Sequence, residues 1–242
     1  MRSGILHENP YGGTEVFMIL NRCNSVGNPK KKQKSKQPWL KEHFDDAYVK
    51  KAQKEGYRSR AVYKLLEIQE RDHLFRSGMT VVDLGSAPGG WSQLTVKYVG
   101  EEGRILALDI LPMEPIDRVE FIQGDFQEQE VLNKMITLMN GRKADLVISD
   151  MAPNISGMNV IDQPKAMCLS DLALDFARKV LVPGGDILIK VFQGAGFDDL
   201  IQELRRSFGK VTTRKPKASR PRSREVYVVA RDYHSHENHI VT

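Results

Sequence analysis

The feature that most constrains this chain is a regular alternation of short apolar runs with longer helical stretches. The runs predict β-strands at 80–84, 105–110, 119–122, 146–149, 187–191, 211–213 and 226–230. The stretches between them predict helices at 90–99, 128–140, 165–180 and 197–208. Strands that alternate with helices form a mostly parallel sheet covered on both faces. The chain is therefore predicted to have a Rossmann-like, doubly wound α/β fold.

Both ends of this pattern depart from the alternation. No helix separates the last two strands, only the basic segment 214–224, so we expect the final strand of the seven-stranded sheet to be antiparallel. Before the first strand, apolar spacing predicts helices at 39–55 and 59–70, the second capped by Ser59. Lys64 lies at the margin of the second helix's apolar arc, where it could point toward a site.

Length and composition favour one domain with appendages. The 242 residues allow one well-buried domain, which we place at 38–232. Residues 1–37 end in a lysine-rich run and are expected to be a mobile basic arm, within which Met18 is an alternative start; 233–242 are expected to be a flexible tail. No apolar run approaches the roughly 20 residues that span a bilayer, and no signal peptide is recognisable. Cys23 and Cys168 are expected to be reduced thiols. These features predict a cytoplasmic protein without a membrane segment.

Charge is unevenly distributed along the chain. Between Arg205 and Arg224 there are nine Lys or Arg residues and no acid, and between Lys30 and Lys64 there are twelve against four acids. A polyanionic partner would suit this polarity, because cationic side chains displace counterions from a phosphate backbone. A basic run by itself is more often a solvated face, so charge raises the question of nucleic acid without answering it.

A glycine turn follows the first predicted strand, in the sequence Val81-Val-Asp-Leu-Gly-Ser-Ala-Pro-Gly-Gly-Trp91. This is where a doubly wound sheet binds nucleotide-like ligands. The spacing of Gly85, Gly89 and Gly90 lacks the Gly-x-Gly-x-x-Gly pattern that holds a diphosphate, which disfavours a dinucleotide. Asp83 at the strand end would repel a pyrophosphate but suits the ammonium and sulfonium of S-adenosylmethionine.

Two further acids follow the next two strands. Asp109 ends the second strand, where a carboxylate commonly holds ribose hydroxyls, and Asp125 follows the third, where it could accept the adenine amino group. Each acid alone is more often a turn or cap residue. Three at successive strand ends, beside a glycine loop, favour a cofactor pocket.

Four charged residues are expected to converge beside this pocket. Asp150 ends the fourth strand, and Lys190 lies within the apolar fifth strand, where a lysine is costly to bury unless it is paired. An ion pair of the two could be purely structural. Glu225 begins the final strand, so an antiparallel direction brings it to the same edge, and Lys64 can approach from its helix.

At this point the sequence resembles the FtsJ (RrmJ) family of bacterial large-subunit ribosomal RNA 2′-O-methyltransferases, from about Pro38 to Ala230. Five blocks carry the resemblance: Ser59-Arg-Ala-Val-Tyr-Lys-Leu65, Asp83-Leu-Gly-Ser-Ala-Pro-Gly-Gly-Trp-Ser-Gln93, Asp150-Met-Ala-Pro-Asn154, Lys190-Val-Phe-Gln193 and Ser219-Arg-Pro-Arg-Ser-Arg-Glu-Val-Tyr227. The family's Lys-Asp-Lys-Glu tetrad matches Lys64, Asp150, Lys190 and Glu225. Its cofactor contacts match Gly89, Trp91, Asp109, Asp125 and Asp150. Ser86 stands where alanine is usual in the family.

The resemblance implies transfer of a methyl group from S-adenosylmethionine to the ribose 2′-hydroxyl of a uridine in 23S ribosomal RNA. The expected partner is the 50S subunit, with the protein acting as a monomer and without a metal. Lys190 would either take the hydroxyl proton or orient the oxygen. The basic zones would hold RNA phosphates. The candidate RNA-binding residues are Lys41, Arg58, Arg60, Lys215, Lys217, Arg220, Arg222 and Arg224.

Three other functions fit parts of the pattern. A non-catalytic RNA-binding assembly factor would be expected to have a broken tetrad or glycine loop, and both are intact. A nicotinamide-dependent dehydrogenase is disfavoured by the glycine spacing and by Asp83. Methyltransferases of transfer RNA or of messenger RNA caps share the tetrad, and only the whole-chain resemblance separates them from the ribosomal enzymes.

Overall fold

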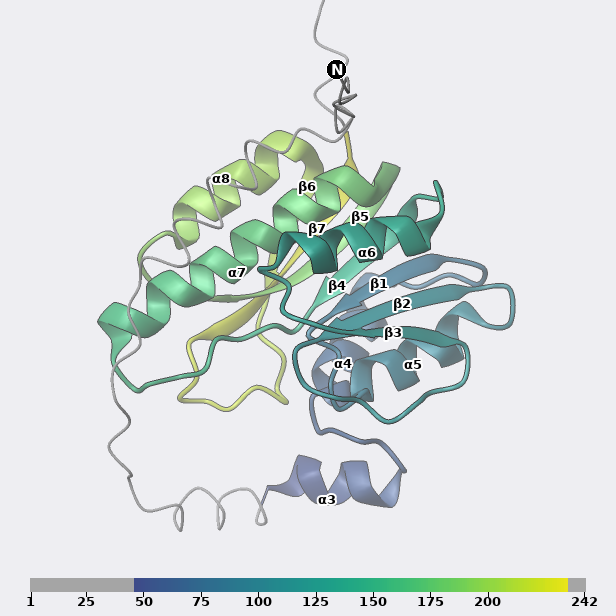
Figure 1. The fold of residues 1–242 in the computed structure, drawn as a ribbon. Helices are drawn as coiled ribbons and strands as arrows, with labels where there is room; N and C mark the ends of the chain where they lie inside the picture. Colours follow the sequence, from purple (N-terminus) through teal and green to yellow (C-terminus); the bar gives the residue numbers. More distant parts are fainter. Residues whose placement is uncertain (1–45, 235–242) are drawn as a thin grey trace, which may run out of the picture.

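The computed structural model describes residues 46–234, which form a seven-stranded sheet (Figure 1). The strand order is β3-β2-β1-β4-β5-β7-β6. β7 lies between β5 and β6 and is antiparallel to both, whereas the pairings among the first five strands are parallel. The predicted mostly parallel sheet with an antiparallel final strand is confirmed. The strands are β1 (Thr80–Leu84), β2 (Arg104–Asp109), β3 (Val119–Gln123), β4 (Ala144–Ser149), β5 (Leu181–Phe192), β6 (Phe208–Arg214) and β7 (Glu225–Tyr233).

Helices cover both faces of the sheet. One face carries α6 (Gln129–Met139), α7 (Asn159–Val180) and α8 (Phe197–Ser207). The other carries α4 (Val62–Asp72) and α5 (Gly90–Val99), with α3 (Ala47–Lys54) contributing Ala52 to the same core. Val81 and Val82 are neighbours in β1 but enter different cores, because successive strand side chains point to opposite faces. The sheet is therefore the wall between two apolar cores.

The helix boundaries differ from expectation at two places. α7 begins at Asn159 rather than near 165, with Pro164 inside it. Pro164 removes only the bond that its amide would make to Val160, a residue that is 86% exposed and open to water. α4 begins at Val62, and Ser59 caps the preceding turn instead, its hydroxyl accepting from the Ala61 amide at 3.1 Å.

Several expectations concern the ends of the chain. The basic arm, residues 39–45 of the first helix and Cys23 lie outside the described residues. Cys168 is disulfide-bonded in the structure, so the prediction of a reduced thiol there is wrong. β7 extends to Tyr233, one residue into the expected tail. The buried ring of Tyr233 packs on Phe208, and its hydroxyl donates to the Arg178 carbonyl at 2.9 Å, which holds this residue on the sheet. Within 46–234, no helix combines the length and apolarity that crossing a membrane requires.

Candidate active site

The glycine turn between β1 and α5 leaves no room for side chains at two positions. Gly85 has a φ of +77°, and a β-carbon there would lie 2.8 Å from the backbone nitrogen of Met151. Gly89 has a φ of +110°, and its β-carbon would lie 2.7 Å from Ile116. Both conformations are ones that other residues rarely adopt. The loop is thus pressed against the segments that follow β4 and β2.

Asp83 is fully buried at the end of β1, beside this turn. Ser92 donates its hydroxyl to Asp83 Oδ2 at 2.6 Å. Burial raises the pKa of Asp83 to about 7, an effect that Ser92 opposes and Asp150 reinforces. In the described chain four buried side-chain polar atoms have no hydrogen-bond partner, and two of them, Asp83 Oδ1 and Ser86 Oγ, lie here. Such atoms at a sheet edge are suited to meeting a ligand.

Asp109 and Asp125 already accept backbone hydrogen bonds. The two oxygens of Asp109 accept from the amides of Ala87 and Leu111 at 2.9 and 2.8 Å. Asp125 Oδ1 accepts from the Gln127 amide at 2.9 Å. These bonds fix both loops, and each carboxylate retains lone pairs, because two oxygens offer about four acceptor sites. Asp109 thereby ties the glycine turn to the end of β2.

The start of α5 packs against the segment that leads into α4. A β-carbon at Gly90 would lie 3.1 Å from the Ser59 side chain. Trp91 is buried, its indole donates to the Ala61 carbonyl at 2.9 Å, and its ring centre lies 5.8 Å from that of Tyr227. Trp91 therefore holds the first turn of α4, from which Lys64 projects, against the sheet.

The sheet register brings the predicted tetrad together. Ser149 pairs with Ile189, which places Asp150 beside Lys190. Because β7 runs antiparallel to β5, Glu225 pairs with Phe192 at the end of β5. Lys64 reaches the same edge from α4 and lies 2.6 Å from Glu225. The predicted convergence of the four side chains is present.

The tetrad forms two ion pairs. Lys190 Nζ lies 3.1 Å from Asp150 Oδ1 and also donates to the Asp150 carbonyl. Burial alone would raise the pKa of Asp150, but Lys190 and Lys64 outweigh it and hold that pKa below its usual value. The pKa of Glu225 is lowered in the same way, because the attraction of Lys64 outweighs the effect of burial. Both carboxylates are therefore ionised at neutral pH, and each buried cation has a partner.

Tyr227 is a site residue that our reading of the sequence missed. It is fully buried, pairs with Lys190 across β5 and β7, and donates its hydroxyl to Asp150 Oδ1 at 2.6 Å. Burial, reinforced by Asp150, raises its pKa well above the usual value, so the phenol stays neutral. A signal was available, because Tyr227 follows Glu225 by two residues and must share its face of the strand.

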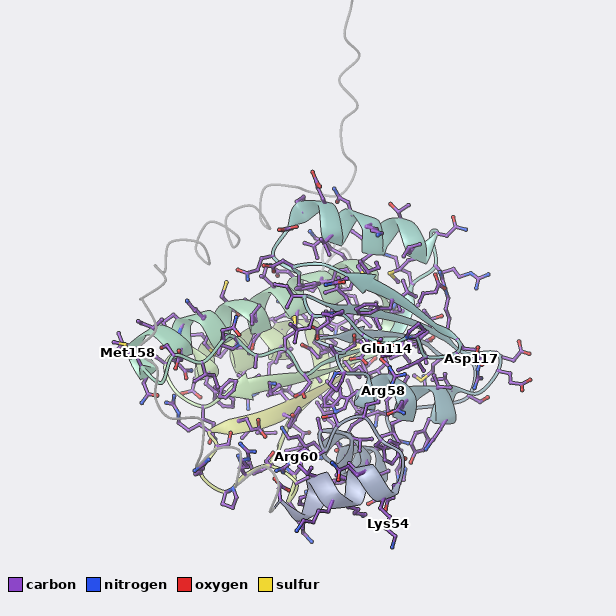
Figure 2. The ribbon with its side chains drawn as sticks, turned by 60° about the horizontal axis from the view of Figure 1, so that its bottom comes forward. Lys54, Arg58, Arg60, Glu114, Asp117 and Met158 are labelled. Carbon is purple, nitrogen blue, oxygen red and sulfur yellow. The ribbon has the colours of Figure 1, made fainter. Side chains whose placement is uncertain are left out.

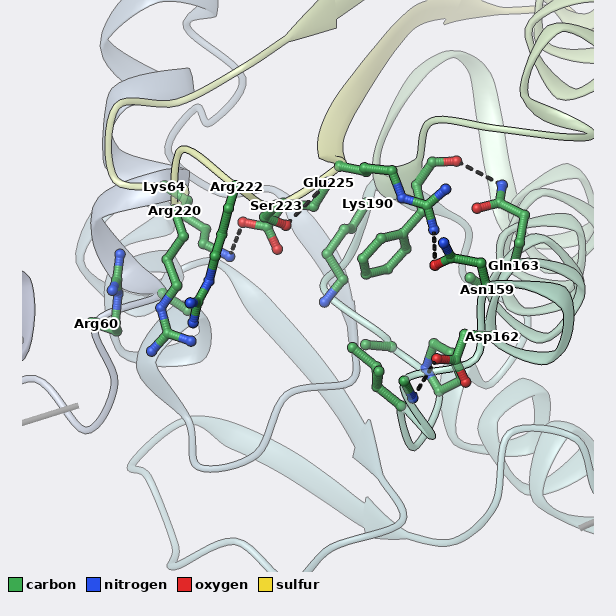
Figure 3. A pocket seen from close by; sticks show the side chains of 18 residues that line it. Arg60, Lys64, Asn159, Asp162, Gln163, Lys190, Arg220, Arg222, Ser223 and Glu225 are labelled. Atoms are coloured by element: carbon green, nitrogen blue, oxygen red, sulfur yellow. Dashed lines mark hydrogen bonds and ion pairs between the residues drawn. The ribbon is translucent and has the colours of Figure 1, made fainter. Parts of the chain in front are cut away.

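A pocket of about 490 Å³ opens at this edge (Figure 3). Lys64, Lys190 and Glu225 line it, together with basic residues from the β6–β7 connection and residues from the start of α7. Asp162 supports the loop before α7 by accepting from the Ser156 and Gly157 amides at 2.8 and 2.9 Å. The pocket volume falls within the range of small-ligand sites.

The candidate RNA-binding residues before α4 occupy different surroundings. Arg60 lines the pocket, pairs with Asp46 and donates to the Ala218 carbonyl. Arg58 does not line it. Its guanidinium donates to the carbonyls of Pro88, Glu114 and Pro115 at 3.3, 2.6 and 2.9 Å, beside the glycine turn (Figure 2). Lys41 lies outside the described residues.

The candidates between β6 and β7 form a loop beside Glu225. Arg220, Arg222 and Arg224 line the pocket, and Arg224 donates to Asn159 Oδ1 at 2.9 Å. Lys215 donates to the carbonyls of Ser223 and Glu225. Lys217 is exposed, and its amide donates to Glu67 at 2.7 Å. No cluster of three or more potential metal ligands occurs among residues 46–234.

Comparison with known proteins places this geometry in a family. The family model for FtsJ-like methyltransferases matches residues 57–233. Proteins named ribosomal RNA large subunit methyltransferase E are 59% identical in Hydrogenovibrio crunogenus, over 83% of this chain and 97% of that protein, and in Chromohalobacter salexigens, over 83% and 96%. A Plasmodium falciparum structure, described provisionally as a ribosomal RNA methyltransferase, is similar with a TM-score of 0.66 and 28% identity, covering 73% of this chain and 98% of that one. The chain belongs to the FtsJ-like methyltransferase family.

Proposed function

We propose that this protein transfers a methyl group from S-adenosylmethionine to the ribose 2′-hydroxyl of a uridine in 23S ribosomal RNA, within the 50S subunit. The observation that carries the proposal is the convergence of the four tetrad side chains at one edge of the sheet, in and beside the pocket. The pocket has a basic rim, formed by Arg220, Arg222 and Arg224. The names of the 59% identical relatives supply the class of RNA.

The residues at the carboxyl ends of β1, β2 and β3 fit S-adenosylmethionine. The Asp83 oxygen that lacks a partner would receive the ammonium of the methionine moiety, Asp109 the ribose hydroxyls and Asp125 the adenine amino group. Gly85 and Gly89 allow the backbone to approach the ligand closely. When bound, S-adenosylmethionine supplies a methyl group on a positively charged sulfur.

Lys190 orients the nucleophile. An ammonium has three N–H donors, and the described chain accounts for two of them, through the carboxylate and the carbonyl of Asp150. The third can hold the ribose 2′-oxygen. In-line displacement would form the bond from the 2′-oxygen to the methyl carbon as the carbon–sulfur bond breaks, with S-adenosylhomocysteine leaving and the hydroxyl proton passing to water. Because oxygen, carbon and sulfur must be collinear, alignment of this kind supplies much of the rate.

Asp150 and Tyr227 hold that lysine in place. Lys190 is 8% exposed, and the ionised Asp150 beside it compensates the cost of burying its charge. Tyr227 donates to the Asp150 oxygen that Lys190 contacts, which restricts rotation of the carboxylate. Lys64, paired with Glu225, and the arginines of the rim would hold the neighbouring phosphates. A substrate with a 2′-hydroxyl must be RNA.

A transfer assay with tritiated methyl groups on S-adenosylmethionine tests this proposal. The purified protein is incubated separately with 50S subunits, free 23S ribosomal RNA and transfer RNA from a strain that lacks the gene, and 2′-O-methylated nucleotides are then mapped. We expect label at a single uridine of the 50S subunit. Lys190→Ala should abolish it, whereas Lys134→Ala, an exposed change on α6, should not.

The other outcomes distinguish the alternatives. Label on transfer RNA alone would retain the chemistry and refute the ribosomal substrate. Cofactor binding without label on any RNA would refute methyl transfer and favour an RNA-binding assembly factor.

A further inference from the structure

The pocket has two unlike walls (Figure 3). Lys64, Arg220 and Arg222 lie on one side, Asn159 and Gln163 of α7 lie on the other, and Lys190 lies between them. Cations suit phosphates, and Lys190 suits the ribose oxygen. A nucleotide oriented in this way would direct its base toward the α7 wall.

Gln163 is held on that wall in one orientation. It is only 7% exposed, and its amide nitrogen donates to the carbonyls of Phe192 and Ala195 at 3.0 and 3.1 Å. Gly194 permits this packing, because a β-carbon there would lie 2.9 Å from Gln163 Oε1. The two hydrogen bonds distinguish the nitrogen from the oxygen, so the amide cannot flip without losing both.

The amide oxygen of Gln163 has no partner in the structure, although it is buried. A buried acceptor without a donor costs free energy, so native structures rarely leave one. Ala166 and Phe192, which also line the pocket, make the surroundings apolar and strengthen any hydrogen bond formed there. A ligand that presents an N–H group to this oxygen would therefore be favoured.

We propose that Gln163 reads the base of the target nucleotide, its amide oxygen accepting the N3–H of uracil. This inference rests on the proposed function and adds a specificity-determining residue to it. Uracil carries a hydrogen on N3, whereas cytosine carries a lone pair there, which would face the Gln163 oxygen and repel it. Sites that hydrogen-bond a substrate N–H reject analogues that lack it, because a buried group is then left unpaired.

The test compares two large-subunit RNA substrates that differ only at the methylated nucleotide, which is uridine in one and cytidine in the other. The readout is the ratio of kcat/KM for the uridine RNA to that for the cytidine RNA. Because both values come from one protein sample, the ratio does not depend on the fraction that is folded. We expect Gln163→Leu to lower this ratio about tenfold.

Two further variants separate base reading from packing. Gln163→Met keeps the length of the side chain but replaces the amide oxygen with a thioether sulfur, a weak acceptor, and should lower the ratio to a similar extent as Gln163→Leu. Gln202→Leu, an exposed change on α8, should leave it unchanged. A third RNA with 3-methyluridine at the target position, which lacks the N3 hydrogen, should be a poor substrate for the wild-type protein.

The outcomes distinguish failure of base reading by Gln163 from failure of the proposed function. If the wild-type protein methylates the uridine RNA but Gln163→Leu keeps the wild-type ratio, base reading by Gln163 is refuted and the proposed function stands. Equal methylation of uridine and 3-methyluridine RNAs by the wild-type protein would refute it too, without any variant. No methylation of the uridine RNA by the wild-type protein would overturn both proposals.

Discussion

The carboxyl edge of the sheet has two halves that are built differently. At the ends of β1, β2 and β3, acidic side chains accept backbone amides or a hydroxyl, as Asp109 accepts from Ala87 and Asp83 from Ser92. At the ends of β4 and β5 and the start of β7, acidic side chains pair with lysines, as Asp150 does with Lys190. The first half is thus acidic and open to a cationic ligand, while the second is balanced in charge within a basic rim.

The difference shows how each half is made. Each acid of the first half lies at the end of its own strand or just after it, so a strand and the next few residues are enough to position it. The second half depends on contacts between distant segments, since Lys64 and Glu225 are brought together by α4 and by the antiparallel β7. A site for a cationic cofactor can thus be built locally, whereas the site for the RNA nucleophile requires the whole sheet.

Asp150 lies at the boundary between the halves, and Asp150→Asn should have the largest effect. The change removes the negative charge beside buried Lys190 while preserving the shape of the side chain. We expect kcat for methyl transfer to fall about a thousandfold, as when a transition-state contact is lost. The dissociation constant for S-adenosylmethionine, measured by calorimetry, should change less than about threefold.

An exposed carboxylate on α8 provides the control, since Asp199→Asn should alter neither quantity. If Asp150→Asn instead weakened cofactor binding tenfold with little change in kcat, Asp150 would belong to the cofactor half, and the two halves would not be separate in function.

The pH dependence of cofactor binding tests the first half. Burial raises the pKa of Asp83 to about 7, so the folded protein keeps this carboxyl neutral in mild acid. A cationic ligand favours the ionised form, and its affinity should therefore rise with pH, about tenfold between pH 5.5 and 7. Over this range the α-amino group of the ligand stays protonated, because its pKa is about 7.7–8.0.

Asp83→Asn cannot ionise and should show a flat profile over the same range. The stability of the cofactor-free protein should move the other way. Because the folded pKa is raised, the stabilisation from the proton on Asp83 is complete below the unfolded pKa and is lost as the pH rises through about 7. A pH-independent affinity in the wild-type protein would show that Asp83 does not meet the charged moiety.

The same division explains what the sequence could predict. The seven strands, the antiparallel direction of the last one and the positions of Asp83 and Lys190 follow from periodicity and from the rule that parallel strands end at one edge. The Tyr227–Asp150 hydrogen bond depends on the register of β5 against β7, which hydrophobic pattern alone does not determine. The orientation of Gln163 is likewise fixed by carbonyls about 30 residues away. Pairings of this kind require the assembled fold.

Substitutions of Arg58 and Arg222 should have the smallest effects, but they discriminate best between the two halves. The sequence predicts that both arginines bind RNA, whereas the structure places Arg58 beside the glycine turn and Arg222 in the pocket. Arg222→Ala should weaken RNA binding about threefold and reduce the slope of log affinity against log salt by about 0.7–0.9. Arg58→Ala should instead weaken S-adenosylmethionine binding about threefold, because its guanidinium joins the turn at Pro88 to the segment after β2 through Glu114 and Pro115. Salt titrations of RNA binding and calorimetry of the cofactor, run on both variants, separate the two roles. Equal reductions of the salt slope would place Arg58 on phosphate, which would mean that the basic rim reaches across to the cofactor half.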